Sequence, residues 1–200
     1  MKSRLLVFAA AVMLTFGAAQ AALIDFEADV AGSKLNGYSP VGHPGVTLTD
    51  TSGADLQINV FCCNQGDGKS LGIFGDDASR LVINFGALQT FVSLDFGNDD
   101  PSRAPVFALL ELFNGATSVG STQLAADNDD TMNQTIALGA IGGFDSARFT
   151  YVDAAGIPLN LIELVDNINY TTRINAVPEP GMLALIGLGL FGLRFSRRKA

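Results

Sequence analysis

Residues 80–85 read Arg-Leu-Val-Ile-Asn-Phe, and residues 91–96 read Phe-Val-Ser-Leu-Asp-Phe. In the first stretch, Leu81, Ile83 and Phe85 occupy alternate positions, which places their side chains on one face of an extended chain. The second stretch alternates in the same way. Such alternation is typical of half-buried β-strands, so these two stretches predict an all-β fold.

Outward from these stretches, short apolar and β-branched runs recur, and Gly, Asn, Asp and Pro separate them. Asn114-Gly115 lies between two runs and predicts a tight hairpin turn. Short strands at this spacing favour a β-sandwich of the jelly-roll type over a barrel. The runs expected to form strands are Leu23–Phe26, Val46–Thr49, Leu56–Phe61, Leu71–Phe74, Leu81–Phe85, Phe91–Phe96, Val106–Phe113, Thr135–Leu138, Ala147–Val152 and Leu161–Tyr170.

The N-terminus has the three parts of a secretory signal peptide. Lys2 and Arg4 are basic, Leu5–Phe16 is apolar, and Ala19-Gln20-Ala21 offers small residues to a signal peptidase. We therefore expect residues 1–21 to form a signal helix that signal peptidase removes after Ala21, and the chain to be exported.

The C-terminus carries a second targeting sequence. Val177-Pro178-Glu179-Pro180 cannot continue a helix or a central strand, because each proline lacks an amide hydrogen and fixes its own φ. An apolar membrane segment at residues 181–195 and a basic tail at residues 194–200 follow this motif. The positive-inside rule predicts that the basic tail stays on the cytoplasmic side. Its basic residues are Arg194, Arg197, Arg198 and Lys199.

This order of motif, apolar segment and basic end resembles the PEP-CTERM protein-sorting signal, whose motif here is Val177, Pro178, Glu179 and Pro180. The same tail is catalogued as an ice-binding-protein C-terminal domain, a label that implies no ice binding. The resemblance implies processing by an exosortase-type membrane transpeptidase. It also implies delivery to the cell envelope, the outer surface or the extracellular matrix.

A lasting membrane anchor is the alternative to a processed tail. The 13 apolar residues from Gly181 to Leu193 would make a transmembrane helix. At the usual helical rise that helix is about 20 Å long, against roughly 30 Å of bilayer hydrocarbon. A short helix of this kind suits transient insertion followed by cleavage better than permanent anchoring.

Between the two targeting sequences we expect one β-sandwich domain at residues 22–170 and a linker at residues 171–176. Residues 22–176 contain six Lys and Arg against 19 Asp and Glu, a net charge of −13. Nucleic acid is excluded as a partner, and anionic lipid surfaces are poor partners, because both need clustered positive charge.

A second resemblance involves three strand segments, Ile24–Glu27, Phe91–Gly97 and Leu164–Ile168. They resemble the strand pattern of galactose-binding-like and carbohydrate-binding jelly rolls. That resemblance implies that the first and last strands lie together and hold a structural calcium ion, for which carboxylates are suitable ligands. The alternative is that these carboxylates form a solvated face of edge strands. The ligand candidates are Asp25, Glu27 and Asp166.

Cys62-Cys63 is the whole cysteine content of the chain. Adjacent Cα atoms are about 3.8 Å apart, below the usual lower limit of about 4.4 Å, so a vicinal disulfide would be strained. A strained vicinal disulfide and an intermolecular crosslink both remain open in an exported protein. Zinc is the least favoured alternative, because His43 is the one histidine and its spacing fits no zinc site.

The sequence offers no complete catalytic constellation. His43 lies in a Gly-His-Pro-Gly turn, and no Gly-x-Ser-x-Gly elbow accompanies it. Sugar platforms are commonly built from exposed Trp or Tyr, but the chain has no Trp. Tyr38, in an Asn-Gly-Tyr-Ser-Pro loop, is the best candidate for a ligand contact, and the phenylalanines at strand positions are expected in the core.

The sequence therefore predicts an exported, non-enzymatic protein that is structural, adhesive or part of the extracellular matrix. A carbohydrate-binding module for extracellular polysaccharide is the alternative, and a secreted hydrolase is a more distant one.

Overall fold

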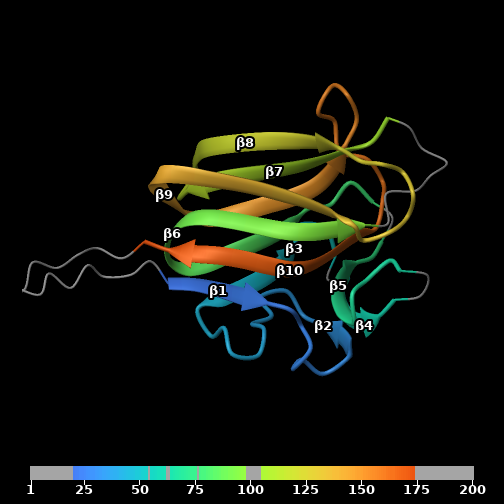
Figure 1. Ribbon diagram of the computed structural model, residues 1–200, viewed down its shortest axis with the longest axis horizontal. Coiled ribbons are helices and arrows are strands. Elements are labelled where there is room, and N and C mark those ends of the chain that lie inside the picture. The colour runs from blue at the N-terminus through green and yellow to red at the C-terminus, as the bar shows by residue number, and fades with distance from the viewer. Residues whose placement is uncertain (1–19, 54, 62–63, 76, 98–104, 174–200) are drawn as a thin grey trace, which may run out of the picture. The chain divides into compact units, whose positions relative to one another are not determined.

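The computed structural model describes residues 20–53, 55–61, 64–75, 77–97 and 105–173, which form ten β-strands and, within these ranges, no helix (Figure 1). Within the same ranges, no helix is long and apolar enough to cross a membrane. Several predictions concern other parts of the chain. Residues 1–19 of the expected signal helix, the sorting motif, the membrane segment with its basic tail, and Cys62 and Cys63 lie outside the described residues. Gln20 and Ala21 were expected at the end of the signal helix, but they begin strand β1 because they pair with β10.

The strands follow one another along the chain with loops of variable length. Their bounds are β1 Gln20–Ile24, β2 Gly32–Lys34, β3 Val46–Asp50, β4 Leu56–Val60, β5 Lys69–Ile73, β6 Leu81–Gly97, β7 Phe107–Asn114, β8 Thr117–Ala125, β9 Gln134–Val152 and β10 Glu163–Thr172.

Two long strands, β6 and β9, build both layers of the sandwich. Each changes register near its middle, and its two halves pair with different neighbours. We call the first layer sheet I. Its strands are β2, β4, β5 and β10, followed by the C-terminal half of β6 and the N-terminal half of β9. Strand β1 also pairs with β10 in this sheet. We call sheet II the layer of β3, the other halves of β6 and β9, β7 and β8.

The hydrophobic core lies between the two sheets, because alternate residues of each strand point inward. Phe96, Phe149 and Tyr151 form an aromatic group in it, with ring centroids 5.5–6.2 Å apart. The buried inward-facing residues of the long strands are Leu81, Ile83, Val92, Leu94, Phe96, Ala147, Phe149 and Tyr151. The all-β sandwich expected from the alternation is therefore confirmed.

The predicted runs match most strands, but no run covers β2 or β8, and other runs differ in their bounds. The runs Leu81–Phe85 and Phe91–Phe96 belong to one strand, β6, and β9 likewise joins two predicted runs. Phe26 is not part of β1 but follows it, with φ at +56°. The hairpin turn at Asn114-Gly115 is confirmed, since Asn114 pairs with Thr117 across it.

The last strand also extends beyond the expected domain boundary. Thr171 and Thr172 belong to β10, although residues 171–176 were expected to be a linker. They remain in the sheet because they pair with Phe91 and Gln89 of β6, in addition to Ala21 and Gln20 of β1 in the uncleaved chain. The folded part therefore reaches Thr172 at one end and Gln20 at the other.

Candidate functional site

The outer face of sheet I carries an exposed pair of aromatic rings. Phe61 and Phe74 are both partly exposed, with ring centroids 5.8 Å apart. Between them lies Gly72, where an added Cβ would approach Phe74 to 2.6 Å and Phe61 to 3.0 Å. Glycine at this position therefore lets the two rings lie against the sheet. The sequence interpretation placed such strand phenylalanines in the core, because the sequence gives no signal that separates an inward-facing residue at a strand end from one on the outer face.

A small surface pocket adjoins the ring of Phe74. Its volume is about 180 Å³, and Ser33, Asp55, Leu56, Gln57 and Phe74 line it. Gln57 pairs with Ser33 of β2 on one side and with Gly72 of β5 on the other, so three neighbouring strands position the lining. One aromatic wall faced by hydroxyl, amide and carboxylate groups is suited to a polyhydroxylated ligand.

Beside this pocket, a row of polar side chains crosses four strands of sheet I. Asp166 of β10 and Asp95 of β6 pair directly in register. Ser70 Oγ donates to Asp166 Oδ2 at 3.0 Å, and Thr135 Oγ1 donates to Asp95 Oδ1 at 2.5 Å. Asn167 Nδ2 donates to Asp95 Oδ2 at 3.1 Å. These hydrogen bonds offset part of the repulsion between two carboxylates that lie opposite each other.

Asp166 is buried although it lies on the outer face of the sheet. Two loops meet nearby: Met132 N donates to Asn64 O at 2.8 Å, and Gln65 Nε2 donates to Asp130 Oδ2 at 2.6 Å. Only 1% of Asp166 is exposed. Burial, together with the negative charges of Asp67 and Asp95, raises the pKa of this carboxyl to about 7.

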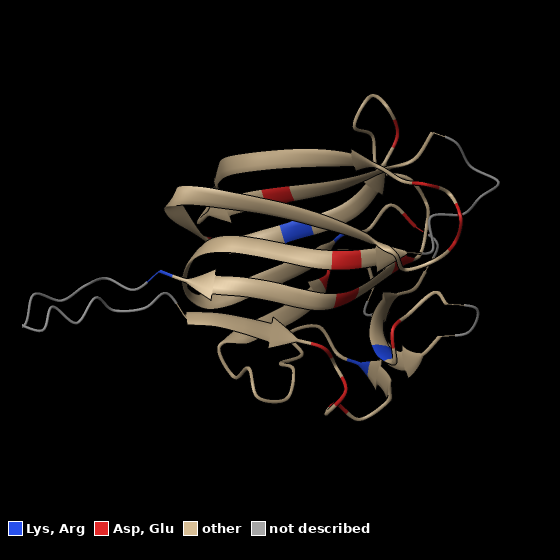
Figure 2. Cartoon of the chain, in the orientation of Figure 1, with Lys and Arg blue, Asp and Glu red and all other residues tan. Residues whose placement is uncertain are grey.

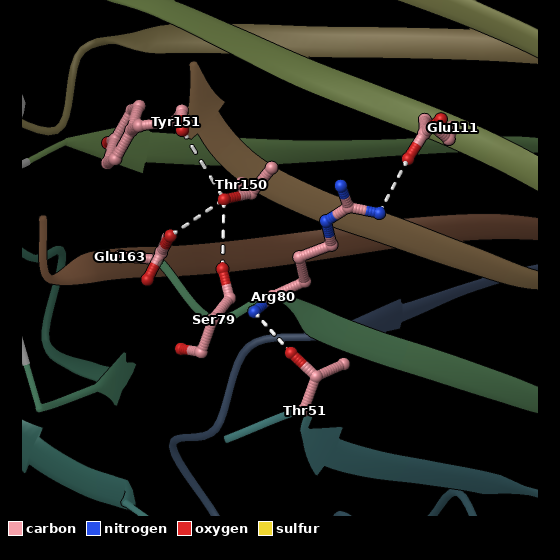
Figure 3. Close-up of polar contacts among 7 residues, drawn as sticks. All are labelled: Thr51, Ser79, Arg80, Glu111, Thr150, Tyr151 and Glu163. Carbon is pink, nitrogen blue, oxygen red and sulfur yellow. Dashed lines mark hydrogen bonds and ion pairs between the residues drawn. The ribbon is translucent and has the colours of Figure 1, made fainter. Parts of the chain in front are cut away.

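A second buried carboxyl, Glu163, lies between the sheets at the start of β10 (Figure 3). Burial raises its pKa to about 8. The Thr150 hydroxyl lies 3.0 Å from Ser79 O and 3.2 Å from Glu163 Oε1. A hydroxyl has one proton, so when Thr150 donates to Ser79, a protonated Glu163 can donate to Thr150. The neutral form of Glu163 therefore fits this network.

Nearby surface contacts in the same view are weaker. Arg80 Nη1 lies 3.6 Å from Glu111 Oε2, and both side chains are partly exposed. Arg80 N donates to Thr51 Oγ1 at 2.9 Å. Such exposed ion pairs contribute at most about 1 kcal/mol.

The expected adjacency of the first and last strands is present, since β1 pairs with β10 and Ile24 faces Ile168. The three calcium candidates nevertheless accept hydrogen bonds from the protein itself. Asp25 Oδ1 accepts from Glu27 N at 3.2 Å, and Glu27 Oε1 accepts from Lys69 N at 2.7 Å. Among the described residues, no group of three or more His, Cys, Asp and Glu side chains is arranged to hold a metal ion. Calcium binding stays a prediction.

The other candidate ligand contact, Tyr38, braces a loop. Its hydroxyl donates to Asp29 Oδ1, which also accepts from Val41 N at 2.9 Å. The Lys34 ammonium lies 5.2 Å from the centre of the Tyr38 ring. Burial, followed by the hydrogen bond to Asp29, raises the pKa of Tyr38 well above its ordinary value. No observation tests the ligand role expected for it.

His43 is part of an aromatic group at the other end of the sandwich. Its Nδ1 lies 2.9 Å from the Tyr170 hydroxyl, and the two rings meet edge to face. Tyr170 also packs on Phe85, with centroids 5.2 Å apart. These contacts give His43 a packing partner.

Residues 176–199 match the PEP-CTERM protein-sorting motif. This match marks the chain as an exported protein that is processed at the cell envelope, as the tail predicted. No curated protein matches the chain.

Several solved structures resemble the folded part at low sequence identity. One is the family 29 carbohydrate-binding module CBM29_1 from Piromyces equi, with 13% identity, TM-score 0.44, and coverage of 78% of this chain and 91% of that one. Another is the arabinose-bound α-L-arabinofuranosidase MgGH51, with 13% identity, TM-score 0.50, and coverage of 78% of this chain and 26% of that one. A third is the K1 cleaved adhesin domain of Lys-gingipain from Porphyromonas gingivalis, with 8% identity, TM-score 0.48, and coverage of 78% and 99%. At these identities the likeness concerns the β-sandwich fold alone.

Proposed function

We propose that this is a non-catalytic protein of the cell envelope whose β-sandwich binds extracellular polysaccharide, and whose tail is handled by an exosortase-type transpeptidase. The pocket beside Phe74 is the observation that carries the binding proposal. A phenylalanine ring supplies a flat apolar surface for the face of a sugar, and Gln57, Asp55 and Ser33 supply hydrogen-bonding groups at its edge.

The net charge of the domain indicates which class of polysaccharide it can bind. The folded part and its flanking residues, 22–176, carry a net charge of −13. Acidic polysaccharides would be repelled by such a surface, so neutral polysaccharides are the expected ligands.

The test is affinity electrophoresis of the purified protein through gels that contain soluble neutral or acidic polysaccharides, followed by titration calorimetry on those that retard it. Phe74→Ala removes the stacking ring and is expected to weaken binding roughly tenfold, which corresponds to about 1.4 kcal/mol. Gln57→Ala is expected to weaken binding as well, because the sugar hydroxyls lose a partner.

The matched control is Phe113→Ala, which removes another partly exposed phenylalanine from sheet II, where its ring lies 4.1 Å from the Arg148 guanidinium. This variant should bind as the wild type does. Equal binding by the Phe74→Ala and Phe113→Ala variants would refute the proposed site, and no retardation by any polysaccharide would refute the proposed ligand.

A structural role in the matrix is the second candidate, and strand β8 favours it. β8 forms the edge of sheet II, and its nine residues include no charged residue and no proline. Edge strands usually carry such residues to prevent pairing with other chains. An edge without them suits a protein that assembles with copies of itself.

A further inference from the structure

Both ends of the folded part emerge side by side. Gln20 at the start of β1 pairs with Thr172 at the end of β10, and Figure 1 shows these two strand ends together at the left of the view. Arg173 is fixed there, because its backbone N–H donates to Leu88 O at 2.8 Å and its Nη1 donates to Gly142 O at 2.9 Å. The chain therefore leaves the sandwich at a defined point toward its C-terminal tail.

This end is built from four chain segments that contact one another. They are the start of β1, the bends of β6 and β9, and the end of β10. Thr90 Oγ1 donates to Thr171 O at 3.3 Å, and Phe91 pairs in register with Gly139. We call this surface the terminal end; its segments are residues 20–24, 86–91, 139–143 and 170–173.

The terminal end exposes large apolar side chains. Ile141, at the bend of β9, is fully exposed at 100%, and Leu23 and Phe91 are exposed to 45% and 39%. A wholly exposed isoleucine on a bend, beside further exposed apolar residues, is unusual for a surface that meets only water.

The charge of the terminal end differs from that of the rest of the domain. Its four segments contain no Asp or Glu, and Arg173 gives them a positive charge. The acids seen in Figure 2 lie on the strands and loops away from this end. The nearest acid beyond the β9 bend, Asp145, accepts a hydrogen bond from Gly115 N at 2.9 Å.

We propose that the terminal end is a lipid-docking surface, which lies on the outer face of the membrane while the tail is inserted. This inference rests on the proposed function, in which an exosortase-type membrane transpeptidase handles the tail, and on the insertion of the tail's apolar segment into the membrane. Seven residues, 174–180, separate Arg173 from the start of the membrane segment at residue 181. Fully extended, they reach roughly 25 Å, so an inserted tail keeps the sandwich close to the bilayer.

The physical chemistry of the terminal end fits this partner. A bulky apolar side chain such as Ile141 can enter the boundary between headgroups and acyl chains. Anionic lipids repel a domain with a net charge of −13. The terminal end contains no acids and carries Arg173, so it can approach such lipids more closely than the rest of the domain can. Because the tail raises the effective concentration of this surface at the bilayer, weak contacts suffice.

The chain lacks tryptophan, which permits a direct test. Two single-tryptophan variants of the chain without its signal sequence, residues 22–200, would carry Ile141→Trp or Ile157→Trp. They would be reconstituted into vesicles of phosphatidylcholine and phosphatidylglycerol with or without brominated acyl chains. Ile157 is the matched control, since it is also an exposed isoleucine, at 61%, but lies in the loop between β9 and β10. Flotation on a density gradient reports separately whether the tail holds the chain to the vesicles.

We expect both variants to float with the vesicles, and brominated lipid to quench most of the emission from position 141 and little from position 157. Flotation without quenching at position 141 would overturn the docking surface and leave the tail insertion intact. Equal quenching at both positions would also overturn it, because the contact would then not be specific to the terminal end. Failure to float would refute membrane insertion by the tail, and the docking surface with it.

Discussion

Glu163 and Asp166 show how burial changes the behaviour of single carboxyl groups. Their pKa values rise from 4.5 to about 8 and from 3.8 to about 7, respectively. Each therefore keeps its proton in the folded protein over a pH range in which the unfolded chain has lost it. The contribution of each protonated carboxyl to the free energy of unfolding is fully present below its pKa in the unfolded chain. It is lost as pH rises through its pKa in the folded protein.

The first prediction concerns this pH dependence. We expect the melting temperature to fall between about pH 4 and pH 8, with up to about 1.4 kcal/mol lost per pH unit for each group. Glu163→Gln mimics the protonated acid, so its melting temperature should fall less across this window and exceed that of the wild type at pH 8. Thermal melts followed by circular dichroism measure both effects.

Glu111→Gln is the control, because Glu111 is a partly exposed acid paired with Arg80 at 3.6 Å. Its pH profile should parallel that of the wild type, with a difference of at most about 1 kcal/mol. If Glu163→Gln also parallels the wild type, Glu163 is ionised in the folded protein and the neutral hydrogen-bond network is wrong.

The sequence could predict where these acids lie along the strands but not their burial. Asp166 was expected to be a calcium ligand or, alternatively, part of a solvated strand face, and it lies on the outer face of sheet I. The loops that meet nearby, at Asn64 and Met132, are far apart in sequence. Phe74 was assigned to the core for a related reason, since an apolar residue after a strand looks the same whether it faces inward or lines a pocket.

At the scale of elements, alternation predicted the strands that have one buried face and missed those without one. β8 reads Thr-Ser-Val-Gly-Ser-Thr-Gln-Leu-Ala, and most of its side chains are exposed, so it carries no apolar period. β2 has only three residues. β6 and β9 were each predicted as two strands because their central bends interrupt the alternation while the chain stays hydrogen-bonded.

The β8 edge gives the second prediction, which belongs to this scale. If the chain assembles through β8, its sedimentation coefficient should rise with concentration, and Ser121→Lys should keep it monomeric. Ser121 faces Glu111 across the β7–β8 pair, so the added lysine has a partner within the monomer and should not destabilise it. Sedimentation velocity over a range of concentrations measures the effect.

Asn84→Lys is the matched control, because Asn84 is exposed on β6 between two neighbouring strands, β3 and β9. It adds the same charge without blocking an edge, and it should associate as the wild type does. If both Ser121→Lys and Asn84→Lys abolish association, the effect is one of net charge and not of the β8 edge. If neither variant changes association, the chains associate through another surface.

At the scale of the whole molecule, the sequence predicted a PEP-CTERM tail and an all-β sandwich, and both are confirmed. Composition alone could not show how the charge is distributed over the folded part. The topology brings residues 20 and 172 together and leaves that end without acids. The net charge of −13 is therefore concentrated on the remainder of the domain.

This charge leads to the last prediction, which concerns salt and calcium. Screening depends on ionic strength, so sodium and calcium chloride at matched ionic strength should raise the melting temperature of residues 22–176 equally. The carboxylates of Asp25, Glu27 and Asp166 already accept hydrogen bonds from protein donors, which leaves screening as the main effect of either salt. A structural calcium ion would instead add RT ln(1 + [L]/Kd), about 2.7 kcal/mol at a hundredfold excess over Kd. A gain that is specific to calcium, reversed by chelator and absent in Glu27→Ala, would contradict equal screening and favour the calcium site.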